Sequence, residues 1–225
     1  DGFQPLNDAN TRPVKVIPRS DQFVGIVTYT GNETARSITM DNSLMSPDFV
    51  WIKTTNHAYW HYLYDTVRGA TKELYSNAAN AEATDAGGLT SFDSNGFSLG
   101  TNIATNGSAK SLVAWCWRAG GAPTATNDNT SGAMDANSVS IDGVLQSAYT
   151  PSGSPSVYPK KMSIGTKQGF SIVTWSRSSS TDSIPHGLSQ APTFIIQKST
   201  SASKRWQVGL SVLGWDRRMY LELTN

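Results

Sequence analysis

The chain has 225 residues, a net charge of +1 and 16% charged residues, with its lysines and arginines scattered along the sequence. This distribution lacks the basic stripe that neutralises a phosphate backbone, so we expect no nucleic-acid partner. No apolar run approaches the ~20 residues that span a bilayer, so no membrane insertion is expected. Cys116 is the single cysteine, so stability must come from packing rather than from a disulfide within the chain, as in a protein folded in a reducing cytosol.

Residues 1–20 contain Pro5, Pro13 and Pro18 and show no sustained periodicity, which predicts an extended leader. They have neither the charged n-region nor the apolar h-region of a signal peptide. Regular structure is therefore expected to begin near Phe23.

The next region, residues 21–119, predicts a first β-sandwich unit. Short runs of β-branched and aromatic residues alternate there with turn-forming clusters, which is the pattern of an all-β, jelly-roll-like fold. The expected strands are 23–29, 35–39, 47–54, 58–64, 72–76, 89–92, 96–99 and 110–117.

Parts of this unit recur later in the chain, which indicates a duplication. Residues 46–53 are similar to 191–198, and residues 25–29 are similar to 171–175. Trp60 matches Trp206 in the same comparison. We therefore expect two sequence-related units rather than one large domain.

The comparison of the two copies also assigns the faces of strands. The strand at 58–64 is expected to point Trp60 inward, because Trp206 is also apolar, and to point His57, Tyr59 and His61 towards solvent. The strand at 110–117 is apolar on both faces and should lie in the middle of its sheet. The large core residues expected on this basis are Phe49, Trp51, Trp60, Trp115, Trp117, Phe194 and Trp206.

Residues 120–167 are rich in Gly, Ser, Asn and Pro, which predicts a long irregular linker with strands only at 139–141 and 144–145. Residues 168–225 then form a second, partial unit that lacks counterparts of the strands at 89–92, 96–99 and 110–117. Such a unit exposes an open sheet edge, so we expect the isolated chain to form oligomers.

Candidate chemistry is sparse. Cys116 is flanked by two tryptophans on a core strand, which indicates an inert thiol. His186 lies in a predicted turn whose counterpart in the first copy carries no histidine. No cofactor is expected, and no metal site either: Asp93-Ser94-Asn95-Gly96 is interpreted as a hairpin turn, and the linker carboxylates as solubilising groups (Asp128, Asp135 and Asp142).

If the chain has a ligand-binding face, the residues expected there are His57, Tyr59 and His61. Histidines four residues apart would bind zinc on a helix, but here they fall on a strand, where they are too far apart for a chelate. Aromatic side chains can form a platform for sugars or fill a core, and the sequence leaves Tyr59, Trp175 and Trp215 undecided between the two.

Several motifs together resemble a tandem β-domain of unknown function found in virion structural proteins of marine tailed bacteriophages, including cyanophages. The motifs are residues 23–29, residues 47–53, Tyr64-Asp65-Thr66-Val67-Arg68-Gly69, residues 89–97 and Val113-Ala114-Trp115-Cys116-Trp117. The second copy departs from this pattern, because residues 209–211 are Gly-Leu-Ser where the first copy has Tyr64 and Asp65.

The resemblance implies a non-enzymatic virion component, part of a tail fibre, tail appendage or capsid fibre, which is assembled in the host cytoplasm and can contact the host surface. Its expected partners are other copies of the chain or other virion proteins, with a host surface glycan as a further candidate. The alternative is a carbohydrate-binding adhesin module or a surface-glycan hydrolase, whose paired carboxylates leave no local sequence signature.

Overall fold

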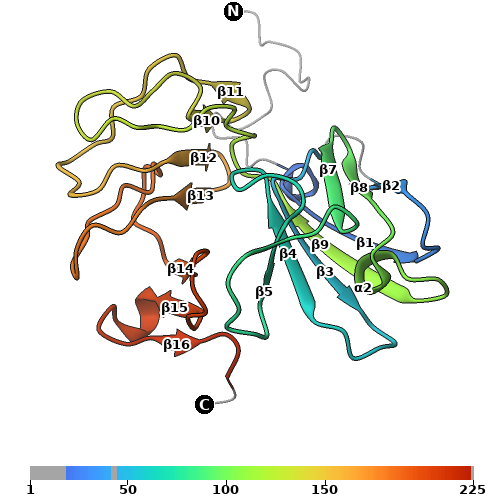
Figure 1. Ribbon diagram of the computed structural model, residues 1–225. Helices are drawn as coiled ribbons and strands as arrows, with labels where there is room; N and C mark the ends of the chain where they lie inside the picture. Colours follow the sequence, from blue (N-terminus) through green and yellow to red (C-terminus); the bar gives the residue numbers. More distant parts are fainter. Residues whose placement is uncertain (1–18, 42–44, 224–225) are drawn as a thin grey trace, which may run out of the picture.

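The computed structural model describes residues 19–41 and 45–223, and the all-β expectation is confirmed (Figure 1). The predicted leader at 1–20 lies almost wholly outside the described residues. The described part of it ends in a short 3-10 helix, η1 (Ser20–Gln22), which leads into β1.

The first unit is a two-layer sandwich. Its larger sheet has the strand order β1-β9-β3-β4-β5-β6, and its smaller sheet has the order β2-β8-β7. A one-turn helix, α2 (Ile103–Asn106), precedes β9 and is capped by the Asn102 side chain, which accepts hydrogen bonds from the backbone N–H groups of Ala104 and Thr105. The strands are β1 (Val24–Thr30), β2 (Arg36–Thr39), β3 (Phe49–Thr54), β4 (His61–Asp65), β5 (Lys72–Tyr75), β6 (Ala83–Thr84), β7 (Leu89–Asp93), β8 (Gly96–Leu99) and β9 (Ser111–Trp117).

The smaller sheet covers one face of the larger sheet, and this inner face is most deeply buried along β3 and β9. Along β3 and β9 every second residue is buried, because successive side chains of a strand point to opposite faces. The core combines these inward residues with those of the smaller sheet: Ile38, Met40, Met45, Val50, Ile52, Tyr64, Leu89, Phe97, Leu99, Leu112, Ala114 and Cys116.

The stretch 120–167, expected to be an irregular linker with strands only at 139–141 and 144–145, is mostly irregular but carries one strand more than expected. It carries β10 (Val139–Ile141), β11 (Val144–Leu145) and β12 (Lys161–Gly165), which join β13 (Phe170–Thr174) in a sheet ordered β11-β10-β12-β13. The first two strands have the expected bounds. The third, β12, was missed although it forms a local hairpin with β13 through residues 166–169; its other partner, β10, lies twenty residues or more earlier in the chain.

The end of the chain repeats part of the first unit. The sheet β14-β15-β16, made of β14 (Phe194–Gln197), β15 (Gln207–Leu210) and β16 (Met219–Tyr220), reproduces the order β3-β4-β5. A second 3-10 helix, η2 (Ser211–Leu213), follows β15. Gly69 and Gly214 hold corresponding turns with φ of 101° and 84°, a region that favours glycine.

The register of this repeat corrects the orientation assigned to Trp60. Phe49 pairs with Asp65 and Phe194 pairs with Leu210, so the structural counterpart of Trp206 is His61 rather than Trp60. A slip of one residue moves a side chain to the other face of a strand. Trp60 is accordingly 43% exposed, whereas Trp206 is 5% exposed.

The other expected core residues lie outside the main core. Phe49, Trp51, Trp115 and Trp117 are half-buried on the outer face of the larger sheet. Phe194, on β14, is 54% exposed, which contradicts its assignment to a core. The error has one cause: the sequence shows that both faces of these strands are apolar, but not which face the second sheet covers.

We predict that Ile52→Ala lowers the free energy of unfolding of the first unit by about 2–5 kcal/mol, because its side chain is fully buried between the sheets. Ile26→Ala is the matched control, since Ile26 lies in the same sheet but is 61% exposed, and its effect should stay within ~0.5 kcal/mol. Urea denaturation measures both. Equal losses would show that the inner and outer faces are wrongly assigned.

We also predict that Cys116 is inert in the folded protein. It is fully buried, and burial raises the pKa of its thiol to about 12, so almost no thiolate forms near neutral pH. A thiol reagent should label it only after addition of denaturant. Labelling of the native chain at the denatured rate would contradict this placement.

Candidate functional site

The outer face of the larger sheet carries a row of apolar side chains across five strands. The strand registers align these residues as Ile26, Trp115, Trp51, Leu63 and Leu74. The two tryptophan rings meet edge to face at 6.2 Å. One end of the row is buried and the other is exposed, so this face is only partly covered.

The second unit covers the buried end of the row. Trp206 packs with Leu63 and Leu74. Its indole N–H donates to the carbonyl oxygen of Tyr75, at 2.7 Å, and also approaches that of Ala78. A large aromatic ring with a satisfied polar atom therefore joins the two units.

His61 is the first residue of β4 and lies on the same face of the sheet as Leu63, beside Trp51. The Trp51 indole N–H donates to His61 Nδ1 at 2.9 Å, and the two rings meet edge to face. An indole N–H can only donate, so Nδ1 must accept and the imidazole is neutral with its proton on Nε2. Burial, and secondarily the charge of Lys53, lower the pKa of His61.

His57 and Tyr59 lie in the loop before β4 and stack with their ring centroids 5.5 Å apart. The Lys53 ammonium fixes this loop by donating to the carbonyl oxygens of both residues. Lys110 Nζ lies 2.9 Å from His57 Nε2. Of the three predicted ligand-binding residues, the structure thus stacks two together and turns the third, His61, towards Trp51.

Asp48 is a buried residue that sequence reasoning missed. Its carboxylate accepts hydrogen bonds from the backbone N–H groups of Ala119 and Gly121 and from the Thr66 hydroxyl. Burial raises the pKa of Asp48, and these hydrogen bonds oppose the rise. The residue fixes the exit from β9 against the start of β3.

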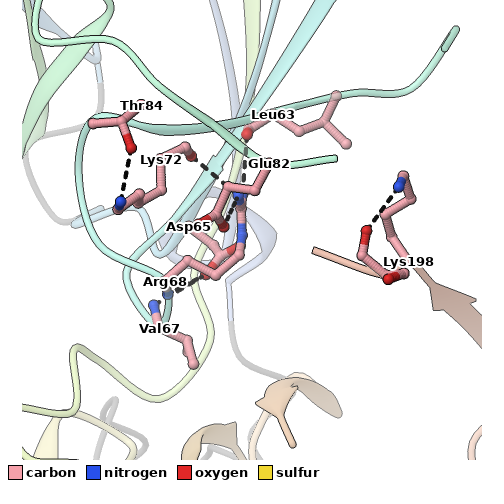
Figure 2. Close-up of polar contacts among 9 residues, drawn as sticks. Leu63, Asp65, Val67, Arg68, Lys72, Glu82, Thr84 and Lys198 are labelled. Carbon is pink, nitrogen blue, oxygen red and sulfur yellow. Dashed lines mark hydrogen bonds and ion pairs between the residues drawn. The ribbon is translucent and has the colours of Figure 1, made fainter. Parts of the chain in front are cut away.

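A second buried carboxylate, Asp65, organises the turn after β4 with Arg68 (Figure 2). Asp65 accepts from the backbone N–H groups of Val67 and Arg68, and its other oxygen lies 2.5 Å from Arg68 Nε. The guanidinium also contacts Glu82 at 3.1 Å and donates to the Leu63 carbonyl oxygen. The carboxylates Asp65 and Glu82 raise the pKa of Arg68 despite its burial.

A third buried carboxylate, Glu73, accepts hydrogen bonds from the phenols of Tyr64 and Tyr75. Burial, together with this carboxylate, raises the pKa of both phenols. All three carboxylates have their oxygens occupied by neighbouring groups of the fold. Their arrangement therefore serves to hold loops and sheet ends rather than to present an acid or base to a substrate.

The sequence offered a weak signal for these carboxylates. Asp48 lies within the repeated stretch, but the second copy has Thr193 at that position. Asp65 and Arg68 lie in the motif at 64–69, which the second copy lacks. The available signal is that these acidic residues flank similar strands in the first copy but are replaced in the second. Such a difference indicates contacts that form in the first unit alone.

The remaining candidates contact neighbouring loops. Asp93 closes the hairpin between β7 and β8 and accepts from the hydroxyls of Ser91 and Ser98. Asp142 accepts from the backbone N–H of Thr166, at 2.9 Å. No cluster of three or more potential metal ligands occurs within 19–41 and 45–223, and no helix in that part is long and apolar enough to cross a membrane.

His186 borders an open hollow of about 300 Å³ lined mainly by serines and prolines. Its Nδ1 accepts from the backbone N–H of Leu188 at 3.1 Å. This hydrogen bond holds the imidazole against the backbone two residues further along the chain.

The fold and its repeat define a tandem all-β protein. The chain belongs to the family described as Domain of unknown function (DUF7483), whose model matches residues 19–154 and 145–225. The two matched segments overlap at residues 145–154, which begin at the end of β11. No curated protein and no solved structure matches the chain.

We predict that the stability of the chain falls as the pH drops below ~6.5, in part because of His61. Its folded pKa lies below its usual value, so the unfolded state binds a proton more readily and acid favours unfolding. Protonation of Nδ1 also removes the acceptor for Trp51. Urea midpoints at pH ~7.5 and ~5.5 measure the change.

His61→Phe is the control for this titration, because it keeps a ring beside Trp51 but cannot bind a proton. The difference between the two midpoints should shrink in this variant. An unchanged difference would show that His61 does not contribute to the pH dependence.

Proposed function

We propose that the chain is a non-enzymatic structural protein of a virion, part of a tail fibre, tail appendage or capsid fibre, and that it assembles with copies of itself or with other virion proteins. The observation that carries this proposal is the direct packing of one unit on the other. Units joined by a shared apolar contact transmit load along a fibre better than units on a flexible linker, since domains without such a contact move independently.

The contact between the units is specific as well as apolar. Trp206 is buried against β4 and β5 of the first unit and hydrogen-bonded to Tyr75. The backbone N–H of Glu82 also donates to the Thr200 carbonyl oxygen at 2.8 Å. Both contacts fix the orientation of the second unit on the first, as a rod built from tandem units requires.

The buried polar groups support a structural role. Asp65 and Glu73 bind groups of their own unit, and Asp48 binds Thr66 and Ala119 of that unit together with Gly121 just after it. The virion assignment itself rests on the sequence motifs that resemble phage structural proteins.

One observation favours the alternative of a carbohydrate-binding adhesin. The stacked pair His57 and Tyr59 lies in a partly exposed loop near the aromatic row that contains Trp51. Flat aromatic faces of this kind bind the apolar faces of sugar rings.

Immunogold labelling of purified particles with antibodies against the chain tests the proposal. We expect gold at fixed positions on the particle and the chain among the particle proteins detected by mass spectrometry. A glycan array and a reducing-sugar release assay complete the test. Absence of the chain from particles, or turnover of a glycan, would contradict the proposal, while binding without turnover would assign the adhesin role.

A further inference from the structure

The open edge of β14 has a defined counterpart in the first unit. β14 corresponds to β3, and β3 is flanked by β4 on one side and by β9 on the other. β14 is flanked by β15, the counterpart of β4, but among the described residues no strand pairs with its other edge. β13, the counterpart of β1, is likewise the last strand of its sheet. Among the described residues, no strand of the second unit thus occupies the place that β9 has between β1 and β3.

The backbone of β14 is oriented to receive such a neighbour. In the first unit, Thr66 N–H donates to the Asp48 carbonyl oxygen, and in the second unit Ser211 N–H donates to that of Thr193. These bonds are equivalent. Because the backbone groups of successive residues point to opposite edges of a strand, corresponding residues of β3 and β14 direct their N–H and C=O groups to the same edge. Phe194 and Ile196 therefore direct their N–H and C=O groups away from β15, as Phe49 and Trp51 direct theirs towards β9.

The side chains of β14 are also uncovered. Phe194, Ile195 and Ile196 are 54%, 44% and 38% exposed, whereas Val50, the counterpart of Ile195, is fully buried. An exposed apolar edge strand pairs readily with another strand. The same three positions in β3 are covered partly by β9.

The first unit shows what chemistry the missing strand needs. β9 places small residues, Ala114 and Cys116, on the face that packs against the second layer, and large residues, Trp115 and Trp117, on the other face. Trp117 contacts Phe49 with ring centroids 5.4 Å apart. Phe194 conserves the ring that makes this contact.

We propose that β14 is a strand-addition site that binds an extended peptide segment of the β9 type, antiparallel to β14, with small residues alternating with aromatic ones. The backbone pairing supplies affinity, and the alternation of side-chain size supplies specificity. This inference goes beyond the proposed function and does not depend on it, because it concerns how the second unit is completed, wherever the chain is located.

A labelled synthetic peptide that copies residues 110–118, with Cys116→Ser to prevent oxidation, tests the site. Fluorescence anisotropy with the full chain should show saturable binding of one peptide per chain. A peptide methylated on the backbone nitrogen corresponding to Trp115 should bind at least about tenfold more weakly, since it cannot donate to β14. This comparison leaves the protein unchanged.

Variants of Ile196 locate the site on the chain. Ile196→Pro removes the outward N–H of β14 at a position where an edge strand tolerates proline, and should weaken binding at least about tenfold. Ile196→Ala keeps this N–H and should weaken binding less. Absence of binding, equal binding by the proline variant, or a chain that pairs with itself through β14 and excludes the peptide would each overturn the proposal.

Discussion

The pairing of β9 with two strands at once is the interaction on which the first unit depends. Just after β9, the backbone N–H of Arg118 donates to the carbonyl oxygen of Phe23. Just after β3, the backbone N–H of Thr55 donates to the carbonyl oxygen of Ser111. Successive residues of β9 therefore bond in turn to β1 and to β3, so the backbone groups on both edges of β9 are paired. Without β9, β1 would be separated from β3 and the inner face would lose its central strand.

The second unit is arranged like a sheet without that strand. β13 belongs to one sheet and β14 to another, although their counterparts β1 and β3 flank β9 in the first unit. Ile195 is exposed, whereas its counterpart Val50 is buried. Gly209, the counterpart of Tyr64, is covered by Trp215, whereas Tyr64 is covered by the second sheet of the first unit. The contact of Trp206 with Leu63 and Leu74 gives the incomplete sheet an apolar support on its other face.

Much of this fold could be predicted from the sequence, because alternation of apolar residues specifies strands and their two faces. The strands of the first unit lie within a few residues of their expected bounds, and β9 lies mid-sheet as its two apolar faces indicated. The face of Trp60 was wrongly predicted because the sequences were aligned by matching Trp60 to Trp206, whereas the strand register matches Trp206 to the next residue, His61. The site of Asp48 depends on partners distant in sequence, such as Ala119, 71 residues from Asp48. Local patterns carry no signal for such contacts.

The hydrogen-bonding groups of β14 point in the same directions as those of β3, but among the described residues no strand takes the place of β9 beside β14. Amide hydrogen exchange on the chain, kept monomeric by dilution and checked by sedimentation, measures this difference. We expect slow exchange for Phe49 and Trp51, whose N–H groups point towards β9, and fast exchange for Phe194 and Ile196, whose N–H groups face the open edge. Equal protection of the two pairs in the monomer would contradict this expectation.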